Sequence, residues 1–290
     1  MQRIPIQDAG LVGALYLPKS AVPLPLVITL GGFRGGINES RAEKLAAHGF
    51  ASLSLAYFGC SGLPASLREI PLEYFEKALD WAIGQSSIDP HRIALWGVSR
   101  GAEIALLLGS MFPARIRAIA TTVPTSAIYG SIQSDAPAWT YRGQPLAPNA
   151  PFPKLLLEGK AGQTPELAVA LTPYFLEGMK DQAAFAASQI SVEKINCPLL
   201  LVSAEDDQMW PSTLFSEQIL ERLSAKGSTI VRSHLSYPRA GHAISSSEEI
   251  VELHPVAKLW FAFGGTPRDN ARAKEDSWEK TLQFFRLWMC

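Results

Sequence analysis

The residues best suited to chemistry form the pentapeptide GVSRG at residues 97–101, which matches the pattern G-x-S-x-G. It follows a short apolar run, Arg92 to Trp96, and opens a segment of helical character. The two glycines allow a sharp strand-to-helix turn, where a side chain would collide with neighbouring backbone. The pattern therefore predicts that Ser99 is a nucleophile, and that alanine at either glycine impairs folding.

A serine hydroxyl is a weak nucleophile at neutral pH, so it needs a base within hydrogen-bond reach and an acid that orients the base. After a turn of this type, the acid and then the base are expected further along the chain. His242 lies in a loop after the last predicted strand, and we assign it as the base. The other histidines are disfavoured by order or by their predicted element: His48, His91, His234 and His254.

Three acidic residues, Glu205, Asp206 and Asp207, follow a predicted strand from Pro198 to Ser203. We assign Asp207 as the orienting acid, because related hydrolases commonly carry the acid four residues before a proline that opens the next helix. Asp206 is the alternative, and its other role would be to cap the turn.

Attack by Ser99 on a carbonyl would place negative charge on oxygen, which two backbone amides usually stabilise. We expect one amide from Arg100 and the other from Phe33, with Gly32 as the alternative. Gly32 and Phe33 lie in the glycine-rich loop GGFRGG at residues 31–36. This loop lacks the G-x-G-x-x-G and Gly-Lys-Ser/Thr patterns of phosphate-binding loops, which disfavours a nucleotide-binding role for it.

Strands and helices alternate along most of the chain, which predicts an α/β fold whose mostly parallel sheet carries helices on both faces. The predicted strands are Arg3–Gln7, Leu11–Leu17, Leu24–Leu30, Phe50–Tyr57, Arg92–Trp96, Ile116–Val123, Pro198–Ser203 and Ile230–Tyr237. The predicted helices are Asn38–His48, Pro71–Ile83, Arg100–Met111, Thr213–Ala225 and Asn270–Trp288, with weaker helices near Glu166–Phe175 and Asp181–Ser188.

The alternation lapses between about residues 124 and 189. We interpret this stretch as a cap-like insertion over the carboxyl ends of the strands, where open α/β sheets bind ligands. The absence of repeats and linkers indicates one domain over residues 1–290.

Composition excludes several classes of function. The 290 residues have a net charge of −1, which gives no global attraction for nucleic acid or an anionic membrane. No signal peptide or membrane-spanning run is recognisable. The three cysteines, Cys60, Cys197 and Cys290, are too scattered for a disulfide framework or a zinc site. We therefore expect a cytoplasmic protein with free thiols and no metal or cofactor.

Five stretches of the chain resemble the C-terminal catalytic domain of the acyl-CoA thioesterases and bile acid-CoA:amino acid N-acyltransferases. They read LGGFRGGINESRAEKLAAHGFASLSLAY, GLPASLREIPLEYFEKALDWA, WGVSRGAEIAL, LLLVSAEDDQMWPS with YPRAGHAI, and FGGTPRDNARAKEDSWEKTLQFF. The resemblance implies an α/β-hydrolase fold of the dienelactone-hydrolase type, a triad of Ser99, Asp207 and His242, and an acyl thioester substrate.

Three departures from the family pattern stand out. Family members usually carry an N-terminal β-sandwich, whereas this chain starts almost directly at the catalytic domain. The nucleophile is cysteine in the amino-acid acyltransferases and serine in the thioesterases, so Ser99 favours hydrolysis. The residues after His242 lack the expected proline-rich continuation.

The resemblance also implies residues that contact an acyl-CoA or a carrier-bound acyl group. We expect Gly32, Arg34, Trp139 and Trp210 to bind substrate. The side chains of Arg34, Arg100 and Arg239 are candidates to bind coenzyme phosphates. The simpler interpretation of each one is a solvated arginine at the surface. The insertion supplies apolar side chains that would line an acyl pocket or form its own core: Trp139, Tyr141, Phe152, Leu155 to Leu157 and Phe175. Hydrolysis of an ester, lactone or amide, acyl transfer to an amine or alcohol, and a binding role without catalysis are the alternatives.

Overall fold

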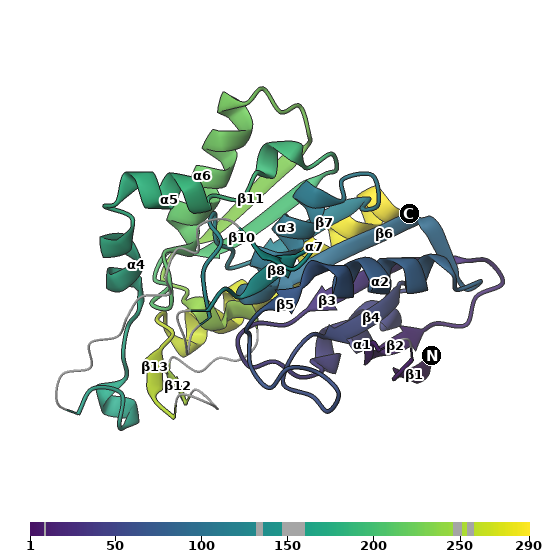
Figure 1. Ribbon diagram of the computed structural model, residues 1–290. Coiled ribbons are helices and arrows are strands. Elements are labelled where there is room, and N and C mark those ends of the chain that lie inside the picture. The colour runs from purple at the N-terminus through teal and green to yellow at the C-terminus, as the bar shows by residue number, and fades with distance from the viewer. Residues whose placement is uncertain (9, 132–135, 147–159, 246–250, 254–257) are drawn as a thin grey trace.

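The computed structural model describes residues 1–290 except 9, 132–135, 147–159, 246–250 and 254–257. Its centre is an eight-stranded sheet of order β1-β2-β4-β3-β6-β7-β10-β11 (Figure 1). The strands are β1 (Gln2–Ile6), β2 (Val12–Leu17), β3 (Leu24–Leu30), β4 (Ala51–Ala56), β6 (Ile88–Val98), β7 (Ala118–Thr122), β10 (Leu199–Ala204) and β11 (Arg232–Tyr237).

The sheet is antiparallel at one edge and parallel elsewhere. β2 pairs antiparallel with β1 and with β4. From β4 through β3, β6, β7 and β10 to β11, every neighbouring pair is parallel. Parallel strands covered on both faces need apolar side chains throughout, and β4 and β10 are accordingly buried along their whole length.

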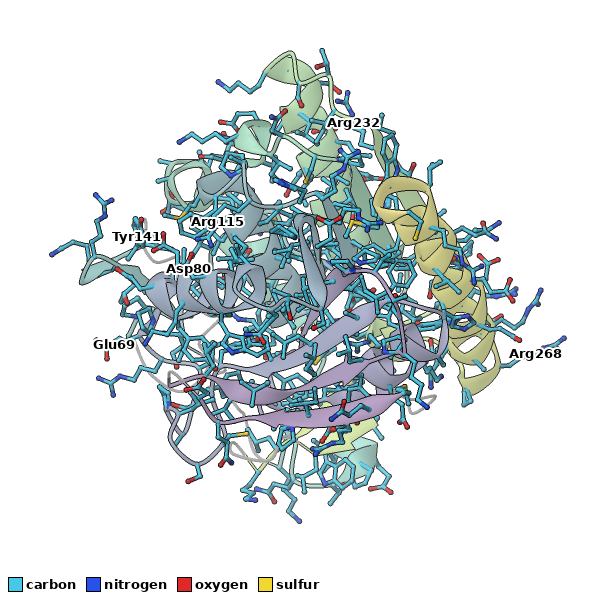
Figure 2. The ribbon with its side chains drawn as sticks, turned by 90° about the vertical axis from the view of Figure 1, so that its right-hand side faces the viewer. Glu69, Asp80, Arg115, Tyr141, Arg232 and Arg268 are labelled. Atoms are coloured by element: carbon cyan, nitrogen blue, oxygen red, sulfur yellow. The ribbon has the colours of Figure 1, made fainter. Side chains whose placement is uncertain are left out.

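Helices cover both faces of this sheet. α1 (Glu39–Ala47) and α7 (Pro267–Met289) share one hydrophobic cluster, which includes Leu45, Trp96 and Phe285. α2 (Leu72–Ile83), α3 (Arg100–Met111) and α6 (Ser212–Ala225) contribute to the other large cluster. Figure 2 shows α7, with Arg268 near its first turn, on one side of the sheet and α2, which carries Asp80, on the other. The layers agree with the predicted α/β class.

Two expectations for the insertion differ in outcome. The predicted helix over Glu166–Phe175 is wrong: the structure has a short 3₁₀ helix, η1 (Pro165–Leu167), and then α4 (Thr172–Gly178). Between them Val169 forms a bridge with Phe261, which uses the backbone groups that a continuous helix would need. The second helix, α5 (Gln182–Ser188), does form, and the Asp181 carboxylate accepts from the Ala184 amide at 3.0 Å.

Several very short elements were not expected, because two to four residues carry no periodic signal. They are β5 (Ile70–Pro71), β8 (Trp139–Tyr141), β9 (Gln144–Pro145), β12 (Val251–Leu253), β13 (Trp260–Ala262), η2 (Val192–Lys194) and η3 (His242–Ser245). In Figure 1, α4 and the β12–β13 pair lie at the same end of the molecule. One domain with a cap-like insertion at about 124–189 stays a prediction.

Within the part of the chain that the structure describes, none of the helices combines the length and apolarity that crossing a membrane requires. Cys60, Cys197 and Cys290 are free.

Candidate active site

Ser99 occupies the sharp turn between β6 and α3. Its φ of 55° is in the left-handed region, which a side chain rarely adopts without support from its surroundings. That support comes from the Ser99 amide, which donates to the Thr122 carbonyl at 3.0 Å, and from its carbonyl, which accepts from Ala102 at 2.8 Å. The turn holds Ser99 at the start of α3, where helix dipoles favour negative charge.

The two glycines of the pentapeptide lie against backbone. A β-carbon on Gly97 would come within 2.0 Å of the Gly101 carbonyl oxygen, and one on Gly101 within 2.2 Å of the Leu30 oxygen. Both distances are far below any real contact, so the close approach of β6, α3 and β3 requires glycine at both positions.

His242 and Asp207 meet Ser99 from two distant loops. His242 Nε2 lies 2.9 Å from Ser99 Oγ, and its Nδ1 lies 3.0 and 2.9 Å from the two carboxylate oxygens of Asp207. All three residues are at most 6% exposed. The ring can thus take a proton from Ser99 while Nδ1–H donates to the carboxylate, which is the arrangement of a nucleophile, a base and an orienting acid.

Asp207 is held in place by its own loop. Its Oδ1 accepts from the backbone amides of Met209 and Trp210 at 3.0 and 3.3 Å. The alternative acid, Asp206, instead accepts from the Gly265 amide at 2.7 Å in an exposed position. The geometry therefore favours Asp207 over Asp206 as the partner of His242.

The loop that carries His242 depends on residues to which the sequence analysis assigned no role. The Gly241 backbone amide donates to Asn270 Oδ1 at 2.7 Å, and Asn270 Nδ2 donates to the Gly264 carbonyl at 3.3 Å. Asn270 is fully buried, and Phe263 accepts from the His242 amide at 2.7 Å. A β-carbon on Gly264 would come within 1.8 Å of the Asp206 oxygen. The sequence signal for these residues was their position in two stretches of the family resemblance, YPRAGHAI for Gly241 and FGGTPRDNARAKEDSWEKTLQFF for the others.

A small cleft of about 70 Å³ lies beside Ser99 and His242. Gly32, Phe33 and Arg34 line it, and a β-carbon on Gly32 would lie 3.1 Å from the Ser99 β-carbon. The glycine loop therefore approaches the nucleophile closely, as an amide that stabilises an oxyanion must do. Arg34 forms an ion pair with the buried carboxylate of Glu252, which also lines the cleft.

The side chain of Arg100 is not available to a coenzyme phosphate or to solvent, which corrects the sequence-based expectation. It is 1% exposed, pairs with Glu103 at 2.8 Å and donates to the Tyr129 and Gly130 carbonyls. Burial raises the pKa of Glu103 to about 7, although Arg100 opposes that shift. The backbone amide of Arg100 lies in the first turn of α3, where helix amides have no partner within the helix.

Two of the four residues that we expected to bind substrate are buried. Trp139 is fully buried in the core, where its indole N–H donates to Glu103. Trp210 is 3% exposed, donates to the Val123 carbonyl and packs edge-on against the His242 ring at 5.6 Å. Trp210 thus supports the histidine, and neither indole lines the cleft.

The remaining expectations for the substrate pocket have separate outcomes. Phe175 is buried beside Trp210 and Tyr129, in a hydrophobic cluster that also includes residues outside 124–189 such as Phe215. Tyr141 packs against Phe112. Arg239 is exposed and pairs with Asp269. Phe152, Leu155 to Leu157 and His254 lie outside the described residues.

Comparison with protein families places this geometry in context. Residues 70–289 match the family model described as BAAT / Acyl-CoA thioester hydrolase C terminal. The chain is 28% identical over 288 residues to mouse mitochondrial acyl-coenzyme A thioesterase 2 and 29% identical to human acyl-coenzyme A thioesterase 1. It is 32% identical over 289 residues to mouse acyl-coenzyme A amino acid N-acyltransferase 2. These alignments cover 98–99% of this chain but only 60–65% of the relatives' length.

Solved structures show the same fold at lower identity. A putative dienelactone hydrolase from Klebsiella pneumoniae superposes with a TM-score of 0.60 at 16% identity, covering 98% of this chain and 97% of that one. A dienelactone hydrolase-like promiscuous phosphotriesterase from metagenomic libraries gives 0.58 at 15% identity and covers 100% and 98%. The likeness confirms the predicted α/β-hydrolase fold.

Proposed function

The chain belongs to the BAAT / acyl-CoA thioester hydrolase C-terminal family, and on this premise we propose that it is a serine hydrolase of acyl thioesters. Ser99 is the nucleophile, His242 the general base and Asp207 the acid that orients His242. The observation that carries the proposal is the continuous hydrogen-bonded series from Ser99 Oγ through the His242 ring to the Asp207 carboxylate.

The reaction follows from this geometry in two halves. Ser99 Oγ attacks the thioester carbonyl while His242 Nε2 accepts its proton, and the intermediate expels the thiol, which takes that proton. Water then attacks the acyl-enzyme with His242 again as base, and the carboxylic acid leaves as the Ser99 hydroxyl is restored. In both halves of the reaction, Asp207 stabilises the imidazolium of His242 and keeps the ring's other proton on Nδ1.

The backbone amides of Arg100 and Phe33 are the proposed donors to the oxyanion. The start of α3 and the close approach of the Gly32 backbone to Ser99 support this assignment. Removing one such donor from an active site costs about 10²–10³-fold in rate, but backbone amides cannot be deleted by ordinary substitution. Gly32→Val, which would crowd the cleft, is the practical perturbation.

A steady-state screen of acyl-CoAs of increasing chain length, beside matched p-nitrophenyl esters, tests the proposal. Wild type should hydrolyse at least one acyl-CoA, and Ser99→Ala should lose at least about 10³-fold in kcat. Equal rates for the two proteins would exclude Ser99 as nucleophile, whereas turnover of esters alone would exclude thioesters as the substrate class.

Acyl transfer is the second candidate, because two relatives at 30 and 32% identity are named acyl-coenzyme A amino acid N-acyltransferases. In that reaction an amine, and not water, attacks the acyl-enzyme. The same assay with added glycine or taurine separates the two, since a transferase forms an N-acyl product whose amount rises with the amine concentration.

A further inference from the structure

A second and larger cavity adjoins the catalytic cleft on the face of the sheet that α1 and α7 cover. It has a volume of about 530 Å³ and lies between these two helices, over Trp96 of β6. Small-molecule sites typically have volumes of about 300–1,000 Å³. The catalytic cleft, at about 70 Å³, has room for the reacting carbonyl but not for a whole coenzyme thioester.

The lining of this groove is positively charged, although the chain as a whole has a net charge of −1. Among the described lining residues, the cationic side chains are Arg41 and Lys44 of α1 and Lys274 of α7, and the anionic one is Glu275. Burial lowers the pKa of Arg41 to about 10, so this side chain stays cationic at neutral pH. A local excess of positive charge in a concave site attracts anions, and phosphate oxygens suit guanidinium and ammonium donors.

Aromatic rings form the rest of the lining. Trp96 and Trp278 lie with ring centroids 5.4 Å apart, with Arg41 over the first indole at 5.5 Å and Lys44 over the second at 5.6 Å. Trp278 is only half-buried, so part of its ring is accessible from the groove. Cations held against indole rings beside accessible ring surface suit a ligand that combines a flat base with phosphates.

The groove is coupled to the catalytic residues through its floor and one wall. Arg41 lines both the groove and the cleft. Thr122, at the groove floor, accepts the Ser99 amide at 3.0 Å, and Ile244 lies two residues after His242. The groove and the cleft therefore share the Arg41 side chain, and Thr122 at the groove floor contacts the backbone of the nucleophile turn.

We propose that this groove binds the phosphorylated nucleoside end of a coenzyme thioester, while the acyl carbonyl lies at Ser99. The inference rests on the proposed function, because it names where the carrier of that substrate is held. Lys44 and Lys274 contact the phosphates, and Trp278 packs against the base.

Calorimetric titration with adenosine 3′,5′-bisphosphate tests the groove without any catalysis. We expect wild type to bind and the double variant Lys44→Ala/Lys274→Ala to bind about tenfold more weakly or worse. Lys280→Ala is the matched control, because it removes the same charge from an exposed position of α7 outside the groove. Glu275→Gln removes the one carboxylate found among the described lining residues and should tighten binding about two- to threefold.

Equal affinity in wild type and the double variant, or no binding to wild type at about 1 mM, would overturn the proposal. Glu275→Gln is expected to increase the affinity, whereas the double variant is expected to decrease it. The test therefore stays decisive even where the double variant folds poorly. A like loss of affinity in Lys280→Ala would also count against it, since general electrostatics would then explain the effect.

A kinetic comparison separates this proposal from the proposed function. The ratio of KM for an acyl-CoA to KM for the same acyl group on N-acetylcysteamine should rise about tenfold in the double variant. Hydrolysis with an unchanged ratio would refute the groove and leave the thioesterase intact. Binding of the bisphosphate with no hydrolysis of either thioester would refute the thioesterase and leave the groove.

Discussion

Replacing Asp207 with asparagine is the sharpest test of how the triad is arranged. The carboxylate and the ring are 1% and 5% exposed, and their atoms approach to 2.9 Å. Charge centres about 4 Å apart interact by about 4 kcal/mol at an effective dielectric constant of about 20. That amount corresponds to about 10³-fold in rate, because each factor of ten costs about 1.36 kcal/mol.

A tautomer effect adds to this electrostatic loss. Asparagine keeps Oδ1, which accepts from the Met209 and Trp210 amides, so its N–H₂ group would face His242 Nδ1. The ring would then carry its proton on Nε2 and could not accept the Ser99 proton. We expect kcat/KM to fall by about 10³–10⁴-fold with little change in fold.

The assay is kcat/KM on the best substrate of the acyl-CoA and ester screen, with circular dichroism to verify folding. Asp206→Asn is the control, because this exposed carboxylate contacts the Gly265 amide and not the ring. It should retain activity within about threefold. A loss below about tenfold in Asp207→Asn, or an equal loss in both variants, would refute the assignment of the acid.

Three further predictions concern stability and positioning. Gly101→Ala should lower the free energy of unfolding by more than about 3 kcal/mol or prevent folding. Gly178 has open space around it, so Gly178→Ala should leave the stability nearly unchanged. Similar melting temperatures for the two variants would contradict the steric argument. Asn270→Ala should lower kcat about 10–100-fold with little change in KM. Asn270→Asp keeps the acceptor for the Gly241 amide and should recover part of the lost kcat. A purely structural role would instead leave kcat unchanged in protein that folds. Burial lowers the pKa of His234, so the folded state favours the neutral ring and loses stability as the pH falls below about 6.5. In thermal melts from pH 7 to 5, the melting temperature of His234→Gln should fall less than that of wild type. Parallel falls in the two proteins would disprove this pH effect.

The order and type of the main elements could be predicted from the sequence, because they depend on local patterns. Continuous apolar runs such as Leu24–Leu30 became β3, and helical segments bounded by Gly or Pro became α1 and α2. The nucleophile turn was recognisable for the same reason, since its two glycines lie within five residues of each other. Short strands such as β12 and β13 carry no such pattern, and they were missed.

The surroundings of each site residue were decided by tertiary packing. Arginine and tryptophan often bind ligands, yet Arg100 and Trp139 are both buried around Glu103. They lie there because α3 and β8 pack against the same part of the core. No spacing rule connects residues 100, 103 and 139. Likewise, Asn270 lies in a helix whose pattern predicts only amphipathic packing, and its support of the His242 loop follows from where α7 begins.

The amino-acid sequence alone determined which side chains were chemically fit for a triad and in what order the chain presents them. It restricted the base to His242 and the acid to Asp207 or Asp206, since their loops follow strands of a parallel sheet. Only the tertiary structure decided that Asp207 faces the ring and that Ser99 and His242, 143 residues apart, come within 2.9 Å. The reason is physical: sequence patterns record the preferences of neighbouring residues, whereas side-chain contacts between distant loops depend on how whole elements pack.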